Sequence, residues 1–70
     1  MIKLSVINKL KDFRHDKRMN QTEFAQFLEM DVTQYNRYEK QKMQPNLETA
    51  LEISEKLNTT VNDIFQRISE

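Results

Sequence analysis

The chain has 70 residues, which is enough for one compact domain and too few for two. It contains no cysteine, which excludes disulfides and thiolate metal sites, and no glycine, which favours helices joined by short turns over sheet-rich folds. The formal net charge is zero, but residues 1–42 hold nine lysines and arginines against six acidic residues, and residues 43–70 hold two against five, so one face can still be basic enough to hold phosphates.

Apolar residues at Val6, Ile7, Leu10 and Phe13 form the first periodic stretch, with charged residues on the other side. This spacing predicts an amphipathic helix. We expect it to end near Arg18, where basic side chains complement the negative end of the helix dipole. For residues 1–4 two alternatives remain open, an extension of this helix or a loose arm.

Asn20, followed three residues later by Glu23, has the spacing of a capping box and predicts a second helix over about residues 21–28. Asp31 is the candidate N-cap of a third helix, residues 32–40. At 100° per residue, an arc of about 140° on this third helix holds positions 32, 33, 36, 37 and 40. The third helix therefore presents a small, polar and basic face, opposite a side that carries Tyr35 and Tyr38.

Pro45 disfavours helix at the residue before it, so residues 40–45 are predicted to form a loop. Asn46 is the candidate N-cap of a fourth helix, and Asn58 is suited to the left-handed position after its end. Thr60 and Asp63 form another capping pair, which opens a last helix that continues to Ile68. The fourth helix carries its apolar residues at Leu47, Ala50, Leu51, Ile53 and Leu57. We expect five helices and no domain boundary.

These segments together resemble the Cro/repressor-type helix-turn-helix proteins, often called the Xre family. The resemblance covers about residues 6–66 and depends on the order and spacing of several fragments. They are Leu10-Lys11-Asp12-Phe13-Arg14, Asn20 to Leu28, Asn36-Arg37-Tyr38-Glu39, Pro45 to Leu51, and Leu57-Asn58 to Ile64-Phe65.

The resemblance implies an all-α, compact five-helix bundle of the lambda-repressor-like kind, a single DNA-binding domain over residues 1–70 with its motif at about 21–40. It implies that the third helix enters the major groove of double-stranded DNA. The residues that would contact bases are Val32, Thr33, Asn36 and Arg37. The residues that would contact phosphates are Gln21, Gln34, Lys40 and Lys42.

Two further pairs follow from the resemblance. Arg14 and Glu39 are expected to form a partly buried ion pair between the first and third helices, because an unpaired buried charge would be strongly destabilising. Phe65 and Ile68 either complete the core of the monomer or form a dimer interface with a twin helix. The resemblance favours the dimer, because small members of the family often dimerise through the last helix. A twofold dimer would require a pseudo-palindromic operator with half-sites about 34 Å apart.

The chain departs from the family at two turns. Glu29 stands where the family usually has glycine between the second and third helices, and Lys40-Gln41 replaces a common asparagine-glycine. Non-glycine residues in left-handed conformation cost about 1 kcal/mol each, so these turns are expected to be reshaped or strained. Tyr35 replaces a usual aliphatic residue, and its hydroxyl is expected to reach solvent or a phosphate.

No enzyme is expected, because the chain has no catalytic Ser/His/Asp set, no glycine-rich phosphate loop, and in His15 a single histidine without a metal-binding partner. We expect no cofactor, metal or small-molecule substrate. No apolar run approaches the roughly 20 residues of a membrane span. The sequence thus predicts a cytoplasmic regulator, and we expect a repressor encoded by a bacterium or a phage. The alternative is a protein-binding module that kept the fold, such as an antitoxin or part of a regulatory complex.

Overall fold

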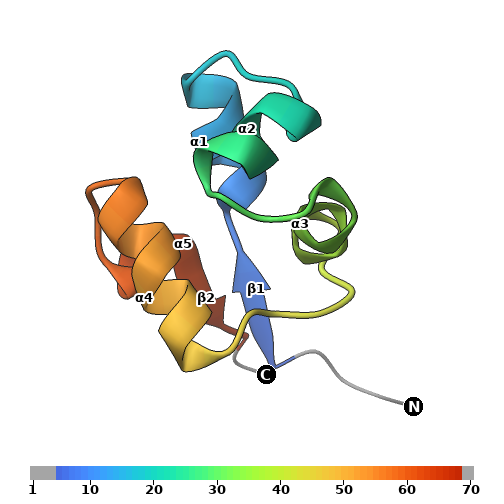
Figure 1. Ribbon diagram of the computed structural model, residues 1–70. Helices are drawn as coiled ribbons and strands as arrows, with labels where there is room; N and C mark the ends of the chain where they lie inside the picture. Colours follow the sequence, from blue (N-terminus) through green and yellow to red (C-terminus); the bar gives the residue numbers. More distant parts are fainter. Residues whose placement is uncertain (1–4, 69–70) are drawn as a thin grey trace.

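A computed structural model describes residues 5–68 of the protein. Within them, five helices and two short strands follow one another along the chain (Figure 1). In order they are β1 (Val6–Asn8), α1 (Leu10–Asp16), α2 (Gln21–Phe27), α3 (Val32–Glu39), α4 (Leu47–Lys56), α5 (Val61–Ile64) and β2 (Phe65–Arg67). Residues 1–4, for which the sequence left a helix extension or an arm open, lie outside the described residues.

The two strands pair antiparallel and join the beginning of the described chain to its end. Val6 lies opposite Arg67, Ile7 opposite Gln66, and Asn8 opposite Phe65. In Figure 1, β1 runs through the middle of the molecule, with α1 and α2 above it, α3 on one side and α4 on the other. This two-stranded ribbon therefore links the helix-turn-helix half of the molecule to the α4–α5 half.

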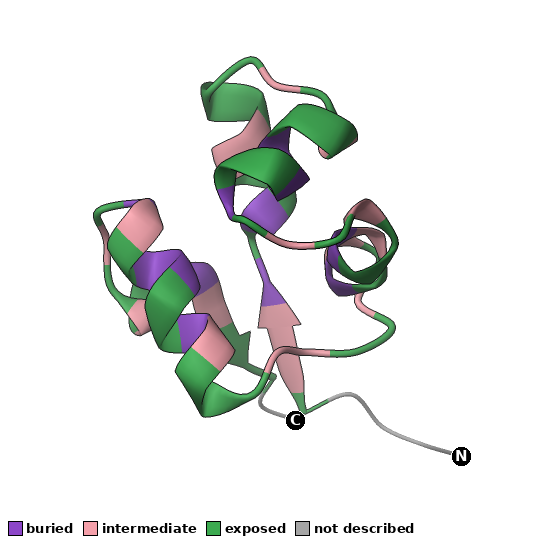
Figure 2. Ribbon diagram, viewed as in Figure 1, coloured by how far each residue is buried: buried purple, intermediate pink, exposed green. Residues whose placement is uncertain are grey.

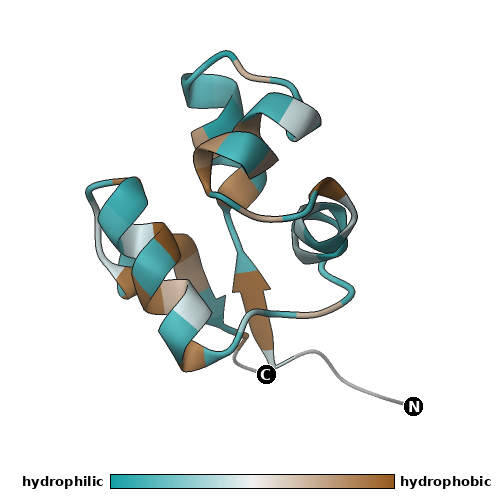
Figure 3. Cartoon of the chain, in the orientation of Figure 1, coloured by the Kyte–Doolittle hydropathy of each residue, from teal (hydrophilic) through white to brown (hydrophobic). Residues whose placement is uncertain are grey.

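A single hydrophobic cluster is formed by buried residues from all five helices. Its centre is aromatic: the rings of Phe24 and Tyr35 meet edge to face with centroids 5.3 Å apart, so α2 and α3 pack closely. Figures 2 and 3 show that the buried and hydrophobic segments face the interior, while the outer sides of the helices are exposed and hydrophilic. The cluster contains Leu10, Phe24, Ala25, Leu28, Tyr35, Tyr38, Ile53, Leu57 and Ile64.

The prediction of an all-α fold is wrong at both ends of the described chain. The first helix begins at Leu10, because Val6 and Ile7 belong to β1, and the last helix ends at Ile64, where the backbone turns into β2. Val6 and Ile7 are β-branched and suit a strand. Their spacing to Leu10 matched a helix only by coincidence, because a three-residue strand is too short to show its own period. The five predicted helices are present among residues 5–68.

Four helices end in the same way, on a residue in the left-handed region. Arg18, Glu29, Gln41 and Asn58 have φ of 57°, 60°, 62° and 55°. In each case the backbone amide of the following residue donates to the carbonyl five residues before it, which is the hydrogen bond of a Schellman motif. For example, the Met30 amide donates to the Ala25 carbonyl at 2.9 Å. The expected left-handed Asn58 is confirmed, and so is the strained backbone expected at Glu29 and Gln41. Arg18 was not foreseen.

No helix within residues 5–68 is both long enough and apolar enough to pass through a lipid bilayer. Over the same range no three His, Cys, Asp or Glu side chains gather closely enough to hold a metal ion.

Candidate nucleic-acid interface

The two helices of the motif begin on polar caps, as predicted. Asn20 accepts a hydrogen bond from the Glu23 amide at 2.8 Å, and the Glu23 carboxylate accepts one from the Asn20 amide at 2.9 Å, completing a capping box. Asp31 accepts hydrogen bonds from the amides of Thr33 and Gln34. These caps fix where α2 and α3 begin and so set the length of the turn between them.

The Glu39 carboxylate on the inner side of α3 anchors this helix to α1 and α2. It accepts two hydrogen bonds from Arg14, from Nε and Nη2, each at 2.9 Å, one from Gln21 at 3.2 Å, and one from the Tyr35 hydroxyl. Arg14 also donates to the carbonyl of Met19 at 3.1 Å. The side chains of Arg14 and Glu39 are only 13% and 6% exposed, so the expected ion pair is present and well shielded.

The charge state of this network follows from its contacts. Burial alone would raise the pKa of Glu39, but the hydrogen bonds from Arg14, Tyr35 and Gln21 outweigh it and lower the pKa to about 2. Burial, and then the hydrogen bond to Glu39, raise the pKa of the Tyr35 phenol far above its usual value. Near neutral pH the network therefore holds a carboxylate, a guanidinium and a neutral phenol.

Three of the polar side chains proposed from the sequence are engaged in internal hydrogen bonds. The hydroxyl of Tyr35 does not reach solvent or a phosphate, because Tyr35 is fully buried and donates to Glu39. Gln21 is half-buried with its amide on Glu39. Gln34 is exposed, but its amide donates to the Tyr38 hydroxyl at 2.7 Å. Before either glutamine could hold a DNA phosphate through its amide, it would have to exchange an internal hydrogen bond.

The outer face of α3 is centred on Thr33 and Arg37. Both are exposed, and so are Gln34 and Lys40, whereas Val32 is half-buried and packs against the core. In Figures 2 and 3 the side of α3 turned away from the rest of the molecule is exposed, and α3 is mostly hydrophilic. The exposed face is thus rotated from the arc predicted from periodicity, away from Val32 and toward Gln34.

Asn36 lies at the edge of this face and is half-buried. Its side-chain oxygen has almost no solvent contact and no hydrogen-bond partner among the described residues. A buried acceptor without a partner costs about 1–3 kcal/mol, so its retention needs an explanation other than stability.

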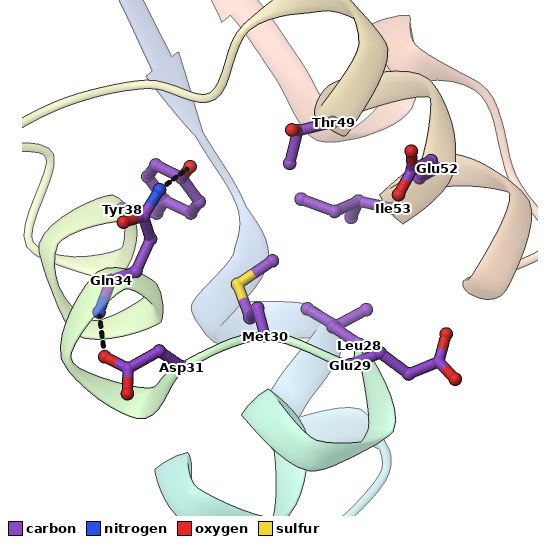
Figure 4. Close-up of a pocket in the computed structure, with 9 residues that line it drawn as sticks. All are labelled: Leu28, Glu29, Met30, Asp31, Gln34, Tyr38, Thr49, Glu52 and Ile53. Atoms are coloured by element: carbon purple, nitrogen blue, oxygen red, sulfur yellow. Dashed lines mark hydrogen bonds between the residues drawn. The ribbon is translucent and has the colours of Figure 1, made fainter.

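A pocket of about 250 Å³ lies beside the turn between α2 and α3, where that turn faces α4 (Figure 4). Its floor is apolar, and Glu29, Asp31 and Glu52 contribute three carboxylates to its wall. Glu29 also pairs with Lys56 on α4, and the Lys56 ammonium lowers the pKa of the Glu29 carboxyl. With Glu29 paired to Lys56, Asp31 and Glu52 still make this wall acidic, so it would repel a phosphate backbone, unlike the outer face of α3 with Arg37.

The two candidate dimer residues lie in different surroundings. Phe65 is half-buried and packs against the core, whereas Ile68 is 37% exposed. Phe65 begins β2 and Ile68 follows that strand, so neither residue lies on a helix, and a dimer through these residues would not pair twin helices.

Sequence reasoning missed three polar residues around the end of α3. Asn8, Gln41 and Gln44 form a hydrogen-bonded cluster that joins β1 to the loop after α3. Asn8 was placed inside a predicted helix, and Gln41 was noted only as a replacement for glycine. The bonds that join Asn8 to Gln41 and Gln44 span more than 30 residues of sequence, so no local pattern could reveal them.

Comparison with known proteins gives this arrangement a family. The helix-turn-helix family matches residues 10–64, which is most of the chain, and the protein belongs to it. This confirms the resemblance to the Xre-type helix-turn-helix proteins. No curated protein sequence matches the chain.

Among solved structures, a protein from Bacteroides fragilis described as "a putative DNA-binding protein" superimposes with a TM-score of 0.73. The match covers 87% of this chain and 98% of that one, at 20% sequence identity. At this identity the likeness supports the fold, including the arrangement of the motif, and function must be argued from the residues themselves.

Proposed function

We propose that this protein is a sequence-specific regulator that binds double-stranded DNA, inserts α3 into the major groove, and represses transcription by occupying an operator. The observation that carries the proposal is the exposed face of α3 around Thr33 and Arg37. That face is polar and basic, and the buried Glu39 network holds it in a fixed orientation. Membership of the helix-turn-helix family supports the same function.

Each side chain of the face suits a different part of DNA. Arg37 can pair with guanine through two hydrogen bonds, and the methyl groups of Thr33 and the more recessed Val32 can contact a thymine methyl. Asn36 suits adenine, whose amino group would supply the partner that its buried oxygen lacks, once the side chain turns outward. Lys40 and Lys42 are exposed beside α3 and suit phosphates, as do Gln21 and Gln34 after exchanging their internal bonds.

We also propose that the repressor is a homodimer that uses the C-terminal strand with Ile68. Ser5–Ile68 and Lys9–Ile64 are hydrogen-bonded across the ribbon, so by alternation the backbone groups of Arg67 point away from β1. Those groups have no partner among residues 5–68. The outer edge of β2 could therefore pair with the same edge of a second copy, the two copies being related by a twofold axis. Such a dimer predicts a pseudo-palindromic operator.

The first experiment selects bound sequences from a random duplex pool and then titrates the best one at salt concentrations from about 50 to 200 mM. Neutralising about four to six phosphates per subunit would make the affinity fall steeply with salt. Salt-sensitive binding with a clear sequence preference is expected. Absence of salt-sensitive binding to any duplex would refute the DNA function.

A second experiment separates base contacts from phosphate contacts. We expect Arg37→Ala to relax the preference at one base pair and to weaken operator binding by about 1–3 kcal/mol. Lys42→Ala should weaken binding to all duplexes alike and reduce the salt dependence. If both variants weakened every duplex equally, Arg37 would have no role in base recognition.

The alternative function, a protein-binding module, has one observation in its favour. α4 carries three acidic residues, Glu48, Glu52 and Glu55, together with two leucines, Leu47 and Leu51, that are 71% and 47% exposed. A chain that failed to bind any duplex but bound a protein through α4 would support this reading over the repressor.

A further inference from the structure

The loop after α3 takes the place of a third strand beside β1. By the alternation of the ribbon, the backbone groups of Val6 and Asn8 point away from β2. Gln41 pairs with both backbone groups of Asn8, accepting from its amide at 3.0 Å and donating to its carbonyl at 2.9 Å. Gln44 donates to the Val6 carbonyl at 3.1 Å. Two side-chain amides thus cover the outer edge of β1.

The side chain of Asn8 ties the same cluster to α3 itself. Asn8 is 6% exposed, and its Nδ2 donates to the Tyr38 carbonyl and to Gln44 Oε1, both at 2.8 Å. Its Oδ1 accepts from the Leu10 amide at 3.1 Å. The Tyr38 carbonyl, in the last turn of α3, also accepts from the Gln41 amide at 3.0 Å, so Asn8 supplies its second hydrogen bond and links the end of this helix to β1.

The cluster also sets the direction of the two lysines beside α3. Gln41 is half-buried and points to β1, whereas its neighbours Lys40 and Lys42 are exposed. Gln41 has φ of 62°, and the Lys42 amide bonds the carbonyl of Arg37 at 3.0 Å. The position of this loop, and of both cations on it, therefore depends on the hydrogen bonds to Asn8.

We infer that Asn8 is a positioning residue for DNA recognition: its side chain donates to the Tyr38 carbonyl and to Gln44, and so fixes the C-terminal end of α3 and the loop that follows it against β1. The inference rests on the proposed DNA function. Asn8 itself lies on the inner side of the molecule and touches no DNA.

The test compares Asn8→Asp with Asn8→Ala. Aspartate keeps an oxygen for the Leu10 amide but removes both donors, whereas alanine removes all three side-chain hydrogen bonds. Both variants keep the backbone groups that bond Gln41. If the donors position α3, both variants lose discrimination between the selected operator and an unrelated duplex, by about tenfold. If Asn8 matters only through the hydrogen bond that it accepts from the Leu10 amide, Asn8→Asp discriminates like the wild type, and the inference is overturned.

Ile53→Val, a conservative change in the core on α4, serves as the stability control, and the melting temperature is measured for every variant. A loss of discrimination in Ile53→Val as large as in Asn8→Asp at equal destabilisation would overturn the positioning role. Amide exchange supplies a second readout: Asn8→Asp should accelerate exchange at Gln41 and Lys42 more than at α4. A wild type without preference for any duplex would refute the proposed function, and this inference with it.

Discussion

Glu39 is the residue on which the orientation of α3 depends most, because four hydrogen bonds from three side chains converge on its carboxylate. A buried ion pair adds little net stability compared with apolar packing, but removing one partner leaves the other charge uncompensated. Arg14, Glu39, Tyr35 and Gln21 therefore act as one unit that specifies how the three helices meet.

Acid should weaken the protein through Glu39. Its pKa is about 2 in the folded protein and 4.5 ordinarily, so the unfolded chain binds more protons between these values. The stabilisation is complete above about pH 5 and is lost as the pH falls toward 2. We expect the free energy of unfolding, measured by urea denaturation, to rise with pH across this window.

Glu39→Gln should flatten that dependence and lower stability near pH 7 by about 3 kcal/mol. Glu48→Gln, which changes an exposed carboxylate at the start of α4, is the control and should leave both nearly unchanged. An equal pH dependence in wild type and Glu39→Gln would show that other carboxylates dominate acid unfolding.

Asn36 should behave in the opposite way to a residue kept for stability. Asn36→Ala removes a buried oxygen that has no hydrogen-bond partner in the described part of the chain, and it places a better helix former on α3. We expect the free energy of unfolding to rise by about 0.5–1 kcal/mol while operator affinity falls about tenfold. Thermal melts and operator titrations measure the two effects. A variant that was less stable than the wild type would mean that the oxygen has a partner after all.

At the scale of elements, the chain repeats one device: four helices each end on a left-handed residue that is not glycine. Arginine, glutamate and glutamine are disfavoured there by about 1 kcal/mol relative to glycine, and asparagine by less. At Gln41 the strain is offset by the hydrogen bonds of its side chain to β1, whereas the exposed side chain of Arg18 has no such bond among residues 5–68.

This difference predicts that two glycine substitutions will have different effects. Arg18 is exposed, so Arg18→Gly should raise the free energy of unfolding by about 1 kcal/mol and the melting temperature by several degrees. Gln41→Gly relieves the same backbone strain but loses both hydrogen bonds to Asn8, so it should give no gain or a loss. Equal gains in both variants would show that the Gln41 contacts contribute nothing to stability.

The elements also show what the sequence could predict. The helices with a polar cap and an apolar stripe, such as the one between Asn46 and Asn58, were predicted with nearly correct bounds, because each signal lies within one turn. The two-stranded ribbon was not predicted, because Val6–Asn8 and Phe65–Arg67 are short and pair with each other only in the complete fold.

The candidate site divides in the same way. Periodicity placed Thr33 and Arg37 on the outer side of α3, and the family resemblance paired Arg14 with Glu39. The inward turn of Tyr35 and the recess of Val32 depend on how α2 and α3 pack, and a pattern of residues along one helix cannot report that packing.

For the whole molecule, the two edges of the ribbon differ. The outer edge of β1 is covered by Gln41 and Gln44, whereas the outer edge of β2 has no partner among residues 5–68. Open strand edges invite pairing with another chain, and this asymmetry limits such pairing to one side.

Two proline substitutions test this arrangement. Gln66 faces Ile7 in a hydrogen-bonded position, so Gln66→Pro should lower the free energy of unfolding by about 1–3 kcal/mol. Arg67→Pro removes an amide that points outward and should leave the monomer nearly as stable. If β2 forms the dimer, Arg67→Pro should also yield monomers in analytical ultracentrifugation, and unchanged dimers would exclude this edge as the contact.

The ribbon finally bears on how the protein is made. Ile7 leaves the ribosome nearly a whole chain length before its partner Gln66, and long-range pairing waits for the closure of the largest loop in the molecule. Gln41 and Gln44 are synthesised before β2 and can cover one edge of β1 while the edge that pairs with β2 is still open. Until β2 has been synthesised the helices can form but the ribbon cannot close, so this fold is completed only when the segment around Gln66 is free to pair with β1.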